Sequence, residues 1–426
     1  MNATPSILKT KAPRSLRQRI GIGIASLGIA LAAALAWQWW QERALRAAEQ
    51  ELARGNAPRA LALAEYFLDL HPESGRAESA RARALVGMGK GAEAGAIYDR
   101  IGAASADDLI AWARSFMLRE QWSRAATILE QALRLRADDA DALYELTTCR
   151  TRLGRLSDAA ESAERYAALP GCRARGDVLL GAIHADANDP DAATLAYARA
   201  LALAPEAEGL QVPPEEFFEQ YATVLMNLGR DDDARELLER GIAVRSTATS
   251  HHLLGKTLAR TGAEEQARSQ WMTSIELDPS AVSPREELVA AALARADLAD
   301  AKKWIGPLER LTDRRFQSAY LFQRLAAFEK DDDAFAAWKV RADALRLNED
   351  RIKSLEQMMA SAPRSSWGVA VRAHKFATLG NWRQAGDLLE GLPKQDDEHP
   401  FIAALREAIR TEGTLPSIEE VPLNTK

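Results

Sequence analysis

The chain has few of the residues that build catalytic centres, metal sites or cross-linked folds. It contains 2 cysteines and 6 histidines in 426 residues, and aromatic residues make up only 6%. Two cysteines form neither a disulfide framework nor a cysteine-rich metal site. A low aromatic content, with Ala and Leu in nearly every segment, favours helices with small contact surfaces over β-rich architecture. The composition therefore predicts an all-α protein.

Acidic residues outnumber basic ones after residue 19. Lys and Arg number 55 against 61 Asp and Glu, so the net charge is −6. Residues 1–19 hold 5 basic side chains and no acidic one, which leaves 50 basic and 61 acidic residues, a net charge of −11, for the rest. A protein that binds duplex nucleic acid needs a basic face. We therefore expect no nucleic-acid partner.

Motifs for catalysis, metals and cofactors are weak. The Gly-Lys-Thr run at 255–257 resembles the end of a phosphate-binding loop, but residue 250 is Ser where such a loop needs Gly. Adjacent His251 and His252 would point about 100° apart on a helix, so they cannot share a metal ion. No nucleophile–base arrangement or carboxylate pair stands out in the sequence. We expect no enzyme activity, metal, cofactor or small-molecule substrate.

One long apolar run lies near the start of the chain. Residues 20–40 read IGIGIASLGIALAAALAWQWW, without a charged residue. As a helix this run would be about 31 Å long, which matches a bilayer core of about 30 Å. Its tryptophans cluster at the far end, where indole rings favour the membrane interface. The sequence predicts a transmembrane helix at 20–40, preceded by a basic tail at 1–19 that stays in the cytoplasm.

Two alternatives to this anchor remain open. The Ala-Leu-Ala at 34–36 fits a signal-peptide cleavage site, although the apolar run is longer than the usual stretch of about 7–15 residues. The opposite orientation would leave the body in the cytoplasm. Both the anchor and the signal peptide export the body.

A repeated pattern runs through the rest of the chain. An alanine recurs at spacings of 34, 31, 34, 34, 41, 33, 34, 33 and 51 residues, and in several units a glycine precedes it by five residues. This period is typical of stacked helix–turn–helix pairs, in which the alanine lets the second helix (B) cross the first (A) closely and the glycine forms the turn. The marker alanines are Ala60, Ala94, Ala125, Ala159, Ala193, Ala234, Ala267, Ala301, Ala334 and Ala385.

The irregular spacings locate insertions. The 41-residue step places an insertion at 206–214, and the 51-residue step leaves room for one extra helix, predicted at 341–363. We assign the solenoid to residues 41–400. Residues 401–426 are predicted to form a short helix that caps the last apolar face, followed by a loose tail.

The period and the small and large positions resemble those of the tetratricopeptide repeat family, over about residues 41–397. The resemblance implies a right-handed superhelical solenoid of about ten helical hairpins after the N-terminal transmembrane helix. The family is a binding fold, so the resemblance implies protein partners in a groove lined by the A helices. It supplies no catalytic residue.

The resemblance also implies which side chains face the groove. In this family they are the second, fifth, ninth and twelfth or thirteenth residues of each A helix, and their mixed polar character here suits an internal peptide segment or a folded protein surface. In the central units these residues are Arg114, Tyr144, Thr148, Arg152, Glu219, Thr223, Asn227, His252, Lys256 and Arg260. Near the C-terminus, Phe316, Trp367 and His374 would form a more apolar surface for a folded partner.

These features lead to two functional hypotheses. The first is a single-pass scaffold in the bacterial inner membrane, with its N-terminus in the cytoplasm and its repeats in the periplasm. It would mediate protein–protein interactions in the assembly of a polysaccharide export complex or another envelope complex. The second is a periplasmic holdase-like chaperone for exported proteins. A scaffold should bind one partner stoichiometrically, whereas a holdase should bind many extended chains weakly.

Overall fold

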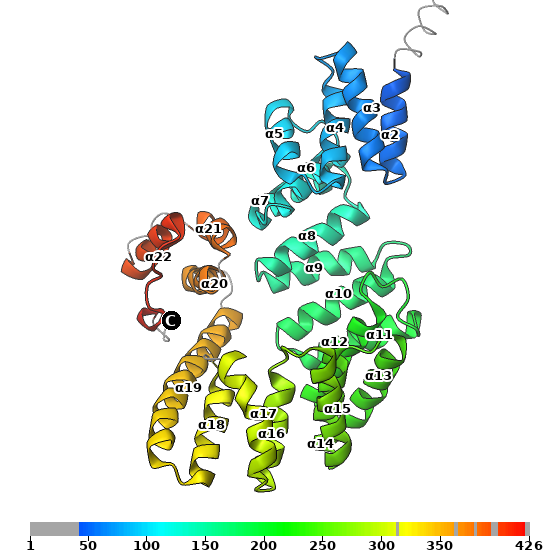
Figure 1. Ribbon diagram of the computed structural model, residues 1–426. Helices are drawn as coiled ribbons and strands as arrows, with labels where there is room; N and C mark the ends of the chain where they lie inside the picture. Colours follow the sequence, from blue (N-terminus) through cyan, green and yellow to red (C-terminus); the bar gives the residue numbers. More distant parts are fainter. Residues whose placement is uncertain (1–41, 312–314, 362–364, 379–380, 393–398, 422–426) are drawn as a thin grey trace, which may run out of the picture. The chain divides into compact units, whose positions relative to one another are not determined.

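The computed structural model describes residues 42–311, 315–361, 365–378, 381–392 and 399–421. Within these residues the regular structure consists of helices alone, which confirms the all-α prediction for this part of the chain (Figure 1). The predicted basic tail and transmembrane helix, residues 1–40, lie outside the described residues. The chain divides into two compact parts, residues 1–104 and 105–426.

The described residues of the first part form two helical hairpins. Their helices are α2 (Arg43–Ala53), α3 (Ala57–Leu70), α4 (Gly75–Gly87) and α5 (Gly91–Ile101). Leu45 and Ala48 of α2, Ala64 and Phe67 of α3 and Ala77 of α4 are buried in one shared cluster. Neighbouring hairpins therefore share a continuous apolar core, as stacked repeats must.

The second part continues the pattern with eight hairpins and one closing helix. The first four hairpins are formed by α6 (Ala106–Met117) and α7 (Trp122–Leu135), α8 (Ala140–Arg152) and α9 (Leu156–Ala167), α10 (Arg173–Asp186) and α11 (Pro190–Leu203), and α12 (Pro214–Asn227) and α13 (Asp231–Val244). The others are α14 (Ala248–Arg260) and α15 (Glu264–Leu277), α16 (Ser283–Ala294) and α17 (Leu298–Leu311), α18 (Phe316–Glu329) and α19 (Asp332–Ser361), and α20 (Ser366–Thr378) and α21 (Trp382–Glu390), followed by α22 (Pro400–Thr411).

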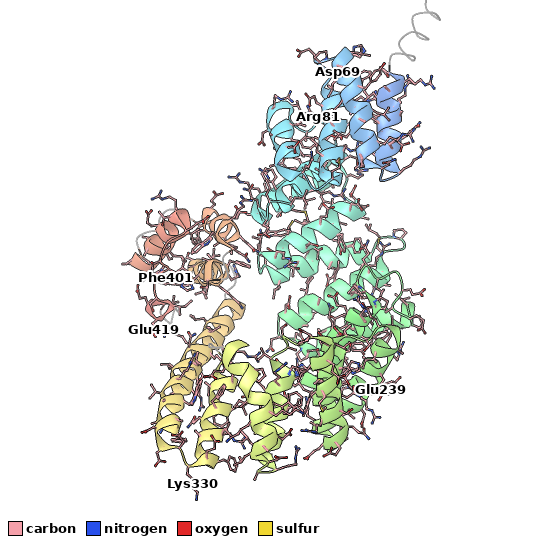
Figure 2. The ribbon with its side chains drawn as sticks, in the orientation of Figure 1. Asp69, Arg81, Glu239, Lys330, Phe401 and Glu419 are labelled. Atoms are coloured by element: carbon pink, nitrogen blue, oxygen red, sulfur yellow. The ribbon has the colours of Figure 1, made fainter. Side chains whose placement is uncertain are left out.

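The turns between A and B helices place one residue in the left-handed region of backbone space. Glycine occupies it without steric cost because it has no Cβ. Five of the six glycines that precede a marker alanine by five residues have φ of 76°, 76°, 67°, 72° and 85°, at Gly55, Gly89, Gly154, Gly229 and Gly262. The sixth, Gly380, lies outside the described residues. Other hairpins keep the same conformation with Glu120, Asn188 and Ala296, and with Lys330 between α18 and α19 (Figure 2).

Close helix crossing explains the marker alanines. Nine of the ten have an exposed fraction of 0%, and only Ala334, on α19, is half-buried. Some A helices carry glycine at the crossing as well. A Cβ on Gly176 would lie 2.4 Å from the Cβ of Ala167, and one on Gly255 would lie 2.4 Å from Nε1 of Trp271. The Gly-Lys-Thr run at 255–257 is thus a packing feature within α14.

The loop between α11 and α12 confirms the predicted insertion at 206–214, but the predicted extra helix is not formed. The 51-residue step arises because α19 is one helix of 30 residues, so residues 341–361 extend a B helix and do not form an extra one; residues 362 and 363 lie outside the described residues. The 41-residue step corresponds to an ordered loop, whose Ala207 and Leu210 are 0% and 3% exposed in the same core cluster as Phe217. Arg240 donates a hydrogen bond to the carbonyl of Pro205 at the start of this loop.

The segment after α22 is held in place as far as residue 421. Arg351 of α19 donates hydrogen bonds to the carbonyls of Ile418 and Val421, at 3.1 and 3.0 Å. His374 of α20 donates to the carbonyl of Pro416 at 2.9 Å, and Val421 is 2% exposed. This stretch is therefore not the loose tail that its Pro- and Glu-rich sequence predicts, because its backbone carbonyls have fixed donors.

Candidate partner-binding surface

The ten residues predicted to bind a partner all lie on A helices: one on α6, three on α8, three on α12 and three on α14. Short side chains cap the starts of α6, α8 and α14, whereas α12 begins at Pro214 without a side-chain cap. Asp139 accepts from the backbone N–H of Ala142 at the start of α8, and Thr247 accepts from that of Ser250 at the start of α14. Such caps fix where α6, α8 and α14 start, and so which residues face the neighbouring repeats.

Arg114 is engaged by the next A helix. Its Nε donates to Oε1 of Glu145 at 2.5 Å, and its Nη2 donates to Oδ2 of Asp141 at 3.0 Å. Glu145 is 8% exposed. Burial raises the pKa of Glu145 to about 7, and the attraction of Arg114 opposes this rise. Removing Arg114 would therefore leave a buried carboxyl group without its cation, so this arginine holds α6 against α8.

Glu219 is engaged in the same way on α12. Its carboxylate accepts from the hydroxyl groups of Thr247 and Ser250, the latter at 2.5 Å, and so joins the cap of α14. Thr223 donates its hydroxyl to the carbonyl of Glu219 at 2.8 Å. Thr148 donates likewise to the carbonyl of Tyr144 at 3.1 Å. These groups stabilise the array and offer a partner little unused hydrogen-bonding capacity.

Arg260 completes this set. It donates to the carbonyl of Met226 at the end of α12, at 2.8 Å, and forms an ion pair with Asp231 at 3.2 Å. Arg114, Glu219 and Arg260 thus each bond to a neighbouring repeat. Their polar groups have partners on a neighbouring repeat, whereas Thr148 and Thr223 bond only within their own helices.

The remaining predicted residues are more open to a partner. Arg152 and Asn227 are exposed, and Lys256 is half-buried. The guanidinium of Arg152 lies 5.8 Å from the centre of the Trp122 ring, and the Tyr144 ring lies 5.7 Å from that of Tyr166. The guanidinium of Arg152 on α8, the amide of Asn227 on α12 and the ammonium group of Lys256 on α14 are thus accessible to a partner.

His252 is a neutral group at physiological pH. Burial lowers the pKa of His252 to about 4, and the positive charges of Lys256 and Arg315 lower it further. Its Nε2 atom is buried without a hydrogen-bond partner among the described residues. The neighbouring His251 is also buried and bonds to Ser246 and Gln270. The two histidines thus differ in role, because only His251 is tied into the structure through both ring nitrogens.

The apolar surface predicted near the C-terminus is covered by the chain itself. The Trp367 ring lies 4.4 Å from that of His399 and 6.0 Å from that of Phe401 on α22, which Figure 2 labels. His374 stacks on the same Phe401 at 6.0 Å. Phe316 stacks on Tyr320 at 5.8 Å. Trp367 and His374 therefore pack within the C-terminal helix group (α20, α21 and α22) and do not form an open docking surface.

The C-terminal helix group also contacts helices far away in the sequence, beside α7 and α8 (Figure 1). Arg383 donates to the carbonyl of Arg119 at 3.0 Å, and Gln384 donates to the carbonyl of Arg152 at 3.3 Å. Sequence analysis did not predict this contact. Two further bonds, from Arg372 to the carbonyl of Gly154 at 3.4 Å and between Arg124 and Glu390 at 3.7 Å, complete the contact.

Within the described residues, no cluster of three or more His, Cys, Asp or Glu side chains could hold a metal ion. Both cysteines, Cys149 and Cys172, are buried as free thiols. None of the helices in this same part of the chain combines the length and apolar character needed to cross a bilayer. The predicted membrane helix at 20–40 falls outside the residues to which that finding applies.

Several residues that shape the surface were missed by sequence reasoning, notably Glu145, Ser250 and Trp122. A signal for two of them was present. Arg114 and Glu145 are 31 residues apart, as are Glu219 and Ser250, so each pair spans nearly one repeat. Charged or hydroxyl residues about one period apart on A helices are thus candidates for bonds between repeats. Positions considered within one helix at a time do not reveal such pairs.

Comparison with known proteins gives one family match. Residues 110–171, which cover α7, α8 and α9 and most of α6, match the family model described as tetratricopeptide repeat. No curated protein matches the chain.

Among solved structures, a tetratricopeptide repeat protein from Parabacteroides merdae is 13% identical, with 56% of this chain and 93% of that chain covered and a TM-score of 0.42. The C-terminal part of a repeat protein from Cytophaga hutchinsonii is 16% identical, with 56% and 97% covered and a TM-score of 0.44. YrrB, described as having an unusual peptide-binding site, is 20% identical, with 41% and 87% covered and a TM-score of 0.35. At these TM-scores the likenesses carry no argument about function.

The family match falls on the hairpins that carry Arg114, Tyr144, Thr148 and Arg152. The same hairpin design recurs from α2 to α21, with the marker alanines buried at the helix crossings. The family match therefore identifies the hairpins at 110–171 as similar to tetratricopeptide repeats, and the rest of the array repeats the same helical-hairpin design.

Proposed function

We propose that this protein is a membrane-anchored scaffold of the bacterial envelope, which binds a protein partner along its central A helices in the periplasm. The charge-free run at 20–40 and the basic residues before it support the anchor and its orientation. The hairpin array supports the scaffold. Assembly of a polysaccharide export complex or another envelope complex is the role that we favour for it.

The proposal rests on a difference between two groups of polar residues on the A helices. Some polar residues bond to the neighbouring repeat, while Arg152, Asn227 and Lys256 keep their side-chain polar groups available on α8, α12 and α14. Polar groups presented at intervals on a rigid surface suit an extended or folded protein, because the partner's backbone and side chains can be matched without reordering the array.

The test is affinity capture from detergent-solubilised membranes of the source organism. The altered protein carries Arg152→Gln, Asn227→Ala and Lys256→Gln. The control carries Arg235→Gln, Glu236→Ala and Lys339→Gln, which change three residues exposed on α13 and α19. We expect wild type and control to retain one dominant co-purifying complex, and the altered protein to lose most of it. Equal capture by both variants would contradict the proposed surface.

The same experiment separates the scaffold from the holdase. A holdase would bring down a broad set of exported proteins, and its yield would be indifferent to these three substitutions. A single complex in near-stoichiometric amount would instead favour the scaffold.

The proposed location has its own test. A reporter that is active only outside the cytoplasm, fused after Lys426, should be active, and a reporter that requires the cytoplasm should be inactive at the same position. Extraction with carbonate should leave the protein in the membrane fraction. Activity of the cytoplasmic reporter would contradict the orientation, and release by carbonate would point to a cleaved signal peptide.

A further inference from the structure

The contact made by the C-terminal helix group has a distinctive chemistry. Its donors are the side chains of Arg383, Gln384 and Arg372. Its acceptors are the backbone carbonyl of Arg152, the last residue of α8, and the carbonyls of Arg119 and Gly154 in the turns that follow α6 and α8. Carbonyls at a helix end have no partner within the helix and carry the negative end of its dipole. The ends of α6 and α8 are therefore a natural acceptor surface for guanidinium and amide groups.

One turn glycine brings the two surfaces close together. A Cβ on Gly154 would lie 2.7 Å from Cδ of Arg372, whereas the corresponding turn glycines Gly229 and Gly262 have no atom within 4 Å of that position. All three have positive φ. The side chain of Arg372 thus rests on a turn that glycine leaves open, and burial lowers the pKa of this guanidinium.

The bonds across this contact are of a kind that opens readily. They include hydrogen bonds to carbonyl groups and the ion pair of Arg124 with Glu390, whose side chains are 53% and 63% exposed. A hydrogen bond exchanged for water contributes modestly to stability, and an exposed ion pair contributes little. When these bonds break, water can replace the partners of the exposed groups on both sides.

The contact also meets the surface assigned above to a partner. Gln384 holds the carbonyl of Arg152, whose guanidinium lies over Trp122. A partner that reaches the backbone around Arg152 must displace Gln384. Closure of this contact and occupation of that end of the surface therefore exclude each other.

We propose that the C-terminal helix group is a reversible latch, which closes onto the ends of α6 and α8 in the free protein and is displaced when a partner binds around Arg152. The role of the partner rests on the proposed function, but the closure itself does not. Because binding and closure are linked, a substitution that opens the latch must strengthen partner binding. The gain in binding free energy equals the free energy that opening the latch requires in the wild type.

The latch is tested with the full chain in detergent or nanodiscs, by energy transfer between dyes on Ser157→Cys of α9 and Ala404→Cys of α22. Both positions are exposed. The native Cys149 and Cys172 are buried, and burial raises the pKa of Cys149 to about 12, so the dyes go to the introduced thiols.

Two matched pairs of variants probe the contact. Gly154→Asn is compared with Gly229→Asn, because Asn tolerates positive φ and only residue 154 meets Arg372. Arg383→Ala is compared with Arg410→Ala, which removes an exposed arginine paired within its own helix. We expect high transfer in wild type and in both controls, and loss of most of the transfer in Gly154→Asn and Arg383→Ala.

The outcomes separate the latch from the proposed function. Unchanged transfer in Gly154→Asn and Arg383→Ala, or equal losses in the controls, would overturn the latch. If transfer is lost as expected, membrane capture of the partner should increase in the same two variants, and unchanged capture would overturn its regulatory role. If none of the proteins captures a partner while transfer distinguishes them, the proposed function fails and the closure stands.

Discussion

At the scale of single residues, the turn between A and B helices sets the main local constraint. Each hairpin with a glycine at that turn meets it without strain, but Ala296 adopts a φ of 56° between α16 and α17. A left-handed backbone costs a residue with a Cβ about 1–2 kcal/mol. The array tolerates this cost because packing on both sides fixes the conformation.

Replacing Ala296 with Gly should therefore stabilise the protein. The relief of strain is partly offset by the greater freedom of glycine in the unfolded chain, so we expect a net gain of about 0.5–1 kcal/mol. Denaturant unfolding and hydrogen exchange in α16 and α17 would measure it. The control Ala198→Gly, at an exposed position within α11, should destabilise by a similar amount. Equal effects of the two substitutions would show that the turn at Ala296 is unstrained.

At the scale of helix pairs, stability depends on close approach between backbones. The strongest case is the crossing of α9 and α10, where a Cβ on Gly176 would lie 2.6 Å from Cα of Ala167. Backbone atoms cannot rotate away as a flexible side chain can. The two helices would have to separate to admit even one methyl group.

We therefore expect Gly176→Ala to destabilise the array by roughly 1–3 kcal/mol through overpacking. Hydrogen exchange should rise mainly in α9 and α10, because these two helices pack mainly on each other and on the adjacent helices α8 and α11. Gly386→Ala in α21 is the matched control, since its nearest contact would be an ordinary 3.7 Å from Ile409. A Gly176→Ala protein as stable as the control would contradict the close crossing.

The helical hairpins could be predicted from the sequence, but the bonds between repeats and the length of α19 could not. The period of the marker alanines and turn glycines predicted the hairpins, because each needs a small residue at a fixed place. The roles of Arg114 and Glu219 could not be predicted in this way, because the repeat register places them on a face but does not show whether a neighbouring repeat binds them. The elongated α19 was missed because its exposed residues follow no repeat pattern.

At the scale of the second part of the chain, closure of the C-terminal helix group should depend on pH. Asp387 of α21 is 6% exposed. Burial raises the pKa of Asp387 to about 6; Glu390 adds to this rise, while Arg124, Arg383 and Arg119 oppose it. Because the closed form holds the proton more tightly than an open, hydrated form would, closure is weakened as the pH rises from about 4 through about 6.

Energy transfer between the dyes at positions 157 and 404 should then be higher at pH 5 than at pH 7.5. Asp387→Asn, which mimics the protonated group, should keep high transfer at both values. The control Asp332→Asn changes an exposed carboxylate on α19 and should keep the wild-type pH dependence. Transfer that increases with pH in the wild type would contradict this assignment of Asp387.

Site-specific photo-crosslinking in living cells tests whether a partner binds along the A helices. A photoreactive amino acid would replace Asn227 on α12 or, as the control, Glu236 on α13, both of which are exposed. If the partner binds along the A helices, we expect one discrete adduct from position 227 and none from position 236. Adducts from position 236 alone, or a broad smear from both positions, would contradict it.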